Sequence, residues 1–146
     1  YIGGHVPEPT YKQVCGGDTG HAEGLRVTFD PTLLTYGDLL DIFFATHDPT
    51  QLNRQGNDIG TQYRSAIFPL NEAQRSEAEA AIVRAQPDWP APIVTTLEAA
   101  TTWYPAEDYH QEYWNGEGQR NPYCLAVIPP KLAKLRKSFA GRIKAG

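Results

Sequence analysis

The chain contains 146 residues with a mass of 16.2 kDa, which is the size of a single domain. Its residues are 40% hydrophobic and 21% charged, a balance that excludes a disordered chain and a collagen-like chain. No apolar run approaches the ~20 residues that a transmembrane helix needs. Cys15 and Cys124 are too few cysteines for a disulfide-rich secreted scaffold, so we expect a reduced, cytoplasmic setting. We expect one domain over residues 1–146.

The net charge of −4 is distributed unevenly along the chain. Residues 131–146 carry six basic side chains and no acidic one, whereas residues 1–130 carry 7 basic and 17 acidic groups. An acidic body repels nucleic acid. The basic end has two interpretations: a patch for nucleic acid or membrane, or a C-terminal helix whose cations favour the negative helix end and the acidic body. We favour the helix, and expect neither nucleic acid nor a membrane as a partner.

The first part of the chain predicts a loop, a strand and a helix. Residues 1–22 are rich in Gly, Pro, Thr and His, and they predict a shaped loop. Alternation of apolar and polar residues over 25–29 predicts a half-buried strand. Thr35 and Asp38 have the spacing of a capping box, which predicts a helix over 36–46.

The middle of the chain predicts a long loop followed by a second strand, a helix and a third strand. Residues 47–62 contain almost no apolar side chains, and loops of this length in a compact domain are usually functional. Residues 63–68 predict a strand, and Asn71 is a suitable cap for a helix that ends near residue 84. Residues 93–97 predict the third strand.

The last part of the chain is first aromatic and acidic and then basic. Residues 98–122 predict a segment with one or two helical turns, and residues 124–128 predict an extended piece. Pro130 in a first helical turn predicts the start of the basic helix. Strands and helices in this order, joined by large loops, predict an α+β domain.

Glu23 is a candidate general acid. It stands where the first loop meets the strand predicted over 25–29. Apolar neighbours disfavour the charged form of a carboxyl group, so its pKa rises and it holds a proton near neutral pH. The alternative is a solvated carboxylate at a strand end, without a role.

Two phenols and two thiols complete the candidates that the residues alone suggest. Tyr11 and Tyr63 lie in or beside glycine-containing segments, and an uncharged phenol can donate a hydrogen bond to a polar oxygen in an apolar pocket. The alternative for each tyrosine is a residue at the edge of the core that has no role in chemistry. The spacing of Cys15 and Cys124 leaves open whether they pair as a disulfide.

The sequence gives little support to zinc or serine chemistry. His21-Ala22-Glu23 matches the His-x-Glu half of a zinc deaminase motif, which also requires a Pro-Cys-x-x-Cys partner. Cys124 alone cannot complete that site, so we expect no metal. No Gly-x-Ser-x-Gly elbow of a hydrolase occurs.

Five ordered motifs closely resemble those of type A peptide methionine sulfoxide reductases, and the resemblance runs from Tyr1 to the basic tail. They are Thr10-Tyr11 with Cys15-Gly16-Gly17-Asp18-Thr19-Gly20-His21-Ala22-Glu23, His47-Asp48-Pro49-Thr50, Arg54-Gln55-Gly56-Asn57-Asp58, Gly60-Thr61-Gln62-Tyr63-Arg64-Ser65-Ala66-Ile67 and Ala106-Glu107-Asp108-Tyr109-His110-Gln111. The resemblance implies a monomeric α+β domain around a ferredoxin-like two-layer sandwich with extended loops. It also implies reduction of the S-epimer of methionine sulfoxide, free or in proteins, which repairs oxidative damage.

The resemblance assigns a role to each site residue. Glu23 protonates the sulfoxide oxygen while a cysteine thiolate attacks the sulfur, and Tyr11 and Tyr63 hydrogen-bond that oxygen. Asp58 binds the substrate through water, and His110 lines the pocket. A second cysteine then forms a disulfide with the attacking one, and thioredoxin restores both thiols, so no bound cofactor is expected.

The two cysteines of the chain differ in what the resemblance implies for them. Cys124 stands where some members place the resolving thiol, whereas Cys15 matches a cysteine without catalytic duty. The nucleophile of the family lies in a Gly-Cys-Phe-Trp motif that precedes a segment like Tyr1-Ile2-Gly3-Gly4, where this chain begins without Met. We therefore expect no nucleophile in this chain, and its first strand and helix to be missing. The alternative to an active reductase is a catalytically dead fragment or binding remnant.

Overall fold

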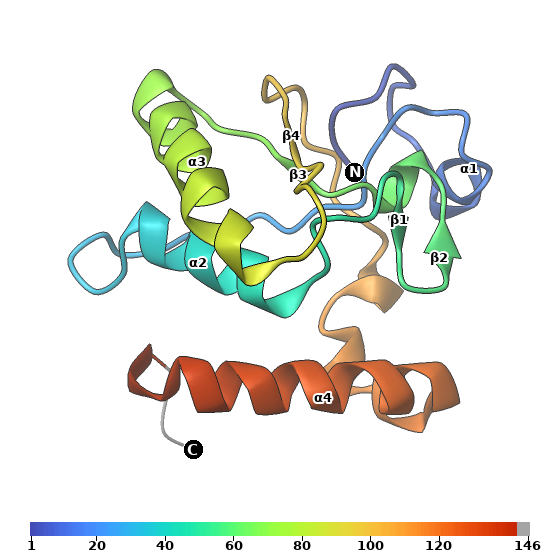
Figure 1. Cartoon of the computed structure of the whole chain (residues 1–146). Coiled ribbons are helices and arrows are strands. Elements are labelled where there is room, and N and C mark those ends of the chain that lie inside the picture. The colour runs from blue at the N-terminus through green and yellow to red at the C-terminus, as the bar shows by residue number, and fades with distance from the viewer. Residues whose placement is uncertain (143–146) are drawn as a thin grey trace.

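The computed structural model describes residues 1–142 and combines helices with short strands (Figure 1). The α-helices are α1 (Tyr11–Cys15), α2 (Tyr36–Thr46), α3 (Glu72–Ala85) and α4 (Pro122–Ser138). The strands are β1 (Arg54–Gln55), β2 (Asp58–Ile59), β3 (Ala66–Ile67) and β4 (Thr96–Leu97). Short 3₁₀ turns occupy Thr61–Tyr63, Gln86–Asp88, Asp108–His110, Tyr113–Asn115, Glu117–Arg120 and Ala140–Arg142. Helices and strands are both present, which confirms the mixed class of the fold.

The strands form two separate ladders within residues 1–142. β1 and β2 are antiparallel, with Gln55 opposite Asp58, and they form a small hairpin inside the long loop predicted over 47–62. β3 and β4 are parallel, with Ala66 opposite Thr96. The finer ferredoxin-like arrangement is not confirmed by these ladders and stays a prediction.

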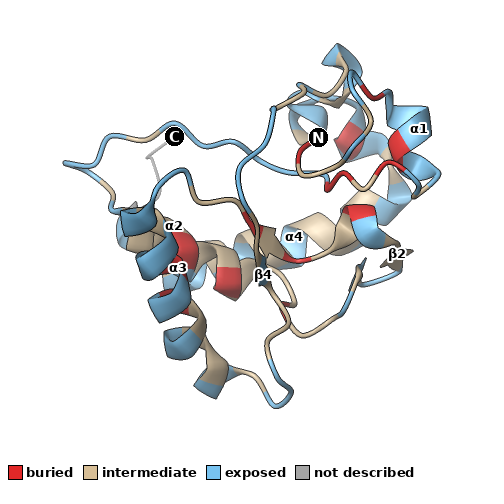
Figure 2. Cartoon of the chain, turned by 90° about the horizontal axis from the view of Figure 1, so that it is seen from above, coloured by how far each residue is buried: buried red, intermediate tan, exposed pale blue. Residues whose placement is uncertain are grey.

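The apolar core lies where α2 and α3 pack on β3 (Figure 2). Leu40 and Phe44 of α2 meet Ala78 and Ala81 of α3, and Ile67 of β3 closes the cluster. The alanine side chains of α3 are small, and they leave room for the aromatic ring of Phe44 between the two helices. Both helices were predicted from their capping residues, and both predictions are confirmed.

The N-terminal loop is held by a second, polar centre around His21, which is 1% exposed. The Nδ1 atom of His21 accepts a hydrogen bond from the Gly4 amide at 3.0 Å, so Nε2 carries the proton that faces the Val6 carbonyl oxygen at 2.7 Å. A Cβ atom at Gly4 would collide with the backbone of Thr19 and His21. The loop predicted over 1–22 is therefore packed around a ring, and it also contains α1.

The strand predicted over 25–29 is absent. No ladder bond joins these residues to another strand, and Leu25 is 87% exposed. An alternating pattern indicates which side chains would share a face, but a strand also needs a neighbour that accepts its backbone bonds. Within residues 1–142 this stretch has no such neighbour.

Helix α4 begins earlier than the sequence indicated. The extended piece predicted over 124–128 is helical, because the Oδ1 atom of Asn121 accepts bonds from the amides of Tyr123 and Cys124 and Pro122 occupies the first helical position. Pro130, which we took for the helix start, lies in the helix interior beside Pro129. The basic end is a helix as expected up to residue 138, and residues 143–146 lie outside the described part.

A chain of side-chain hydrogen bonds joins the end of α2 to the parallel ladder. The Nδ1 atom of His47 faces the carbonyl oxygen of Phe43 at 2.5 Å, and Nε2 faces the hydroxyl oxygen of Ser65 at 2.7 Å. The hydroxyl oxygens of Ser65 and Thr95 are 2.7 Å apart. Desolvation lowers the pKa of His47, the charge of Lys131 lowers it further, and the Phe43 carbonyl and Asp48 oppose the shift. Neutral His47 therefore accepts from Ser65 through Nε2.

Candidate active site

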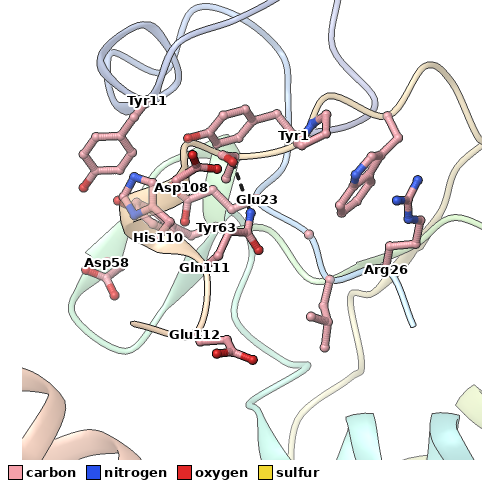
Figure 3. A pocket seen from close by; sticks show the side chains of 15 residues that line it. Tyr1, Tyr11, Glu23, Arg26, Asp58, Tyr63, Asp108, His110, Gln111 and Glu112 are labelled. Carbon is pink, nitrogen blue, oxygen red and sulfur yellow. Dashed lines mark hydrogen bonds between the residues drawn. The ribbon is translucent and has the colours of Figure 1, made fainter. Parts of the chain in front are cut away.

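One cavity of about 800 Å³ gathers the predicted site residues from three distant segments (Figure 3). Five of them line it: Tyr11, Glu23, Asp58, Tyr63 and His110. Other lining residues, among them Tyr1, Trp103, Asp108 and Glu112, carried no role in the sequence prediction. The site is a surface pocket built by loops around the short helix α1 and the β1–β2 hairpin.

Glu23 is placed by the backbone. Its amide donates to the carbonyl oxygen of Gln62 at 2.9 Å, which brings the first loop beside the turn that carries Tyr63. Although the Glu23 side chain reaches solvent, surrounding protein atoms desolvate the carboxylate and raise its pKa. The negative charge of Asp58 raises it further, and the terminal ammonium group of Tyr1 opposes both. The environment therefore favours the protonated form that a general acid needs.

The two phenols are kept protonated by different causes. A hydrogen bond with the Cys15 side chain, one helical turn away, is the main reason that the pKa of Tyr11 rises to about 12. Desolvation, followed by the charge of Glu23, raises the pKa of Tyr63. Gly60 has a φ of 148°, a conformation that residues with a Cβ atom rarely adopt, so the turn that presents Tyr63 depends on glycine. Both phenols can donate a hydrogen bond at neutral pH.

Asp58 connects the pocket to helix α4. Its Oδ2 atom accepts a hydrogen bond from the Tyr123 hydroxyl at 3.0 Å. Cys124 is the next residue, and it is half-buried with a free thiol, whereas Cys15 is exposed and also free. Neither cysteine is among the residues that line the pocket, and the disulfide left open by the sequence is absent.

His110 is packed between aromatic rings at one wall of the pocket. Its ring centroid lies 4.3 Å from that of Tyr11 and 4.3 Å from that of Tyr109. Its Nε2 atom is buried and has no hydrogen-bond partner among the described residues. His110 therefore forms part of the wall and keeps a polar atom free for a ligand.

Glu107 organises the site, although the sequence prediction gave it no separate role. Its Oε1 atom accepts from the Tyr1 hydroxyl at 3.0 Å, and Oε2 accepts from the Tyr11 amide at 2.9 Å and from the Tyr109 hydroxyl at 3.3 Å. Desolvation acts to raise the pKa of Glu107, but these hydrogen bonds outweigh it and lower the pKa. The motif around His110 contained Glu107, whereas nothing in the sequence indicated Tyr1.

The described residues contain no group of three or more His, Cys, Asp or Glu side chains that could hold a metal ion. No helix within residues 1–142 is long and apolar enough to cross a bilayer. The pocket itself combines one carboxyl group of raised pKa with phenol donors. These groups can protonate a polar oxygen of a ligand and donate hydrogen bonds to it.

The chain belongs to the peptide methionine sulfoxide reductase family, whose profile matches residues 1–143. It is 74% identical over 140 residues to the peptide methionine sulfoxide reductase MsrA of Erwinia tasmaniensis, covering 96% of this chain and 79% of that protein. It is 56% identical over 147 residues to the MsrA of Deinococcus radiodurans, covering 99% of this chain and 70% of that one. The resemblance read from the five motifs is confirmed.

Two solved structures show a similar fold. Reduced Mxr1 from Saccharomyces cerevisiae is 42% identical, with a TM-score of 0.73, and the match covers 82% of this chain and 65% of that one. Methionine sulfoxide reductase A of Corynebacterium diphtheriae is 38% identical, with a TM-score of 0.66, and the match covers 82% and 60%. The chain thus spans less than two thirds of the length of either structure.

Proposed function

We propose that the pocket is the substrate site of a reductase that converts the S-epimer of methionine sulfoxide, free or in proteins, to methionine. The observation that carries this proposal is the convergence of Glu23, Tyr11 and Tyr63 on one cavity in a chain of this family. Asp58 and His110 complete the same cavity. A sulfoxide presents a polar oxygen beside an electrophilic sulfur, and these groups suit that oxygen.

The proposed chemistry begins with proton transfer from the carboxyl group of Glu23 to the sulfoxide oxygen. The phenols of Tyr11 and Tyr63 donate hydrogen bonds to the same oxygen, which disperses charge as the sulfur is attacked. A cysteine thiolate attacks that sulfur, and the oxygen passes to the cysteine sulfur. Methionine is released, and the cysteine remains as a sulfenic acid. The sulfur of the substrate gains two electrons, and the cysteine loses them. Asp58 binds the substrate through water in this scheme.

Regeneration requires a second thiol and an external reductant. We propose that Cys124 attacks the sulfenic acid, which forms a disulfide and releases water, and that the dithiol of thioredoxin then reduces the disulfide. The attacking thiolate is assigned to neither Cys15 nor Cys124, because neither stands in a Gly-Cys-Phe-Trp context. The proposal includes the ferredoxin-like sandwich, a monomeric state and a cytoplasmic location.

The proposal is tested by epimer-resolved chromatography of methionine sulfoxide. The gene product that carries these 146 residues is incubated with the S and R epimers, with dithiothreitol or with reduced thioredoxin. We expect consumption of the S epimer alone, with sustained turnover on thioredoxin. Equal consumption of both epimers, or of neither, would overturn the proposed activity.

A second candidate function is a binding module without turnover. The observation that favours it is that neither Cys15 nor Cys124 lines the pocket, so no thiol of the described chain faces a ligand held there. The 146-residue chain then binds a methionine sulfoxide peptide more tightly than its unoxidised counterpart and reduces neither. Calorimetric titration of the two peptides, followed by chromatography of the mixture, separates this module from the reductase.

A further inference from the structure

The pocket is larger than one oxidised side chain needs. Cavities of about 300–1,000 Å³ enclose drug-sized ligands, so a volume of about 800 Å³ leaves room beside a sulfoxide for neighbouring residues of a peptide. What lines that additional space decides which peptides fit. The lining carries four carboxyl groups, from Glu23, Asp58, Asp108 and Glu112, and one guanidinium group, from Arg26.

Of these four carboxyl groups, Glu23 lies near a cation, the terminal ammonium group of Tyr1. None of them forms an ion pair with a basic side chain of the described residues, where the ion pairs join other partners. Asp58 accepts one hydrogen bond from Tyr123, which carries no charge. The charge of Asp58 also contributes to the raised pKa of Glu23, so these groups act on each other across the cavity.

Arg26, the one basic side chain of the lining, stands apart from this acidic side. The Arg26 guanidinium lies over the ring of Trp103, 5.2 Å from the ring centroid, and in Figure 3 Arg26 and Asp58 lie on opposite sides of the pocket. Asp108 and Glu112 are both exposed, so they face solvent that a bound peptide would replace. The cavity is therefore negative along one side and positive at one end.

We infer that the pocket selects methionine sulfoxide in peptides whose neighbouring residues are lysine or arginine, through Asp58, Asp108 and Glu112. This inference rests on the proposed function, and it names the substrate class that the site prefers. Sulfoxides flanked by acidic residues bind poorly, because their carboxylates meet those of the pocket. The net negative charge of residues 1–130 also attracts basic peptides and repels acidic ones, over longer distances.

The test uses the 146-residue chain and four capped peptides in calorimetric titrations. Three contain the S-sulfoxide flanked by lysine, glutamine or glutamate, and the fourth contains unoxidised methionine flanked by glutamine. Each flanking lysine should lower Kd about two- to fivefold relative to glutamine, which is the range of exposed ion pairs. The difference should shrink as salt rises from about 0.02 M to about 1 M, where the screening length is only about 3 Å.

Variants connect the preference to named side chains. Replacing Asp108→Asn together with Glu112→Gln should lower the ratio of affinities for lysine- and glutamine-flanked sulfoxides by about two- to fivefold. Arg26→Gln should raise that ratio. Glu8→Gln is the matched control, because Glu8 is also exposed and, like Glu112, has a positive φ (47° against 51°), but it does not line the pocket. It should leave the ratio unchanged.

The outcomes separate the inference from the function on which it rests. Equal affinity for the oxidised and unoxidised glutamine-flanked peptides would overturn the proposed sulfoxide site. Preference for the oxidised peptide, with the same Kd for lysine, glutamine and glutamate flanks, would overturn the charge selection alone. A preference that persists in the double variant would also overturn it, because Asp108 and Glu112 would then have no part in it.

Discussion

Removal of the Ser65 hydroxyl tests the hydrogen-bond chain that ties helix α2 to strands β3 and β4. Ser65 is 6% exposed, and its oxygen lies 2.7 Å from both His47 Nε2 and the Thr95 hydroxyl oxygen. In Ser65→Ala both contacts disappear and the His47 nitrogen loses its donor. Loss of the Thr95 contact costs ~1 kcal/mol, and a desolvated His47 acceptor without a partner costs ~1–3 kcal/mol, so the free energy of unfolding should fall by about 2–4 kcal/mol.

Urea and thermal unfolding followed by circular dichroism measure this loss. For a domain of this size the expected fall in Tm is roughly 5–15 °C, with an unchanged urea m-value. Ser76→Ala, on the exposed face of α3, is the matched control and should alter stability by less than about 0.5 kcal/mol. A Ser65→Ala protein within about 0.5 kcal/mol of the parent would refute the reasoning, because the chain of bonds would then contribute little.

The same variant has a pH signature. Because the pKa of folded His47 lies below its ordinary value of 6.5, the unfolded chain binds the proton more readily. The stabilisation is therefore fully present above pH ~6.5 and is lost as the pH falls through the folded-state pKa. Ser65→Ala removes the donor that favours neutral His47, so its stability should fall less steeply on acidification. An identical slope in parent and variant would contradict the role assigned to Ser65.

Three further predictions concern the proposed chemistry. Glu23→Gln in the gene product should slow single-turnover sulfoxide reduction by ~10²–10⁴, the usual contribution of a general acid, and an unchanged rate would remove Glu23 from that role. Cys124→Ser should preserve the first turnover and block recycling by thioredoxin, as followed by NADPH oxidation with thioredoxin reductase; sustained turnover would reassign the resolving thiol. The 146-residue chain should show no reductase activity, and stereospecific consumption of the S epimer above a protein-free blank would contradict the assignment of its two cysteines.

The starts of helices α2 and α3 could be predicted because their capping residues bond to amides nearby in the sequence. The capping residues Thr35 and Asn71 each contact an amide three residues away, so the starts of α2 and α3 can be recognised in a short stretch of sequence. The strand predicted over 25–29 is different, because its ladder partner is a property of the whole fold. At α4 Pro130 misled the prediction of the helix start, whereas Asn121 forms the actual cap.

The site was predictable to the extent that its motifs carry chemistry. Glu23, Tyr11 and Tyr63 could be named from the sequence, and the structure brings them to one cavity. Their immediate partners could not be named, since Glu107 reaches Tyr1 across 106 residues and Tyr11 across 96. No local pattern encodes a hydrogen bond between residues so far apart.

Those long-range bonds of Glu107 have a consequence for how the protein is made. The entropy lost on closing a loop grows with its length, and contacts between distant residues slow folding. A nascent chain on the ribosome can form helices α2 and α3 from local contacts, but it cannot complete the pocket until Glu107 has been synthesised and has returned to the first residues. The pocket is therefore assembled late, and its formation reports that the segment of Glu107 has met the segments of Tyr1 and Tyr11.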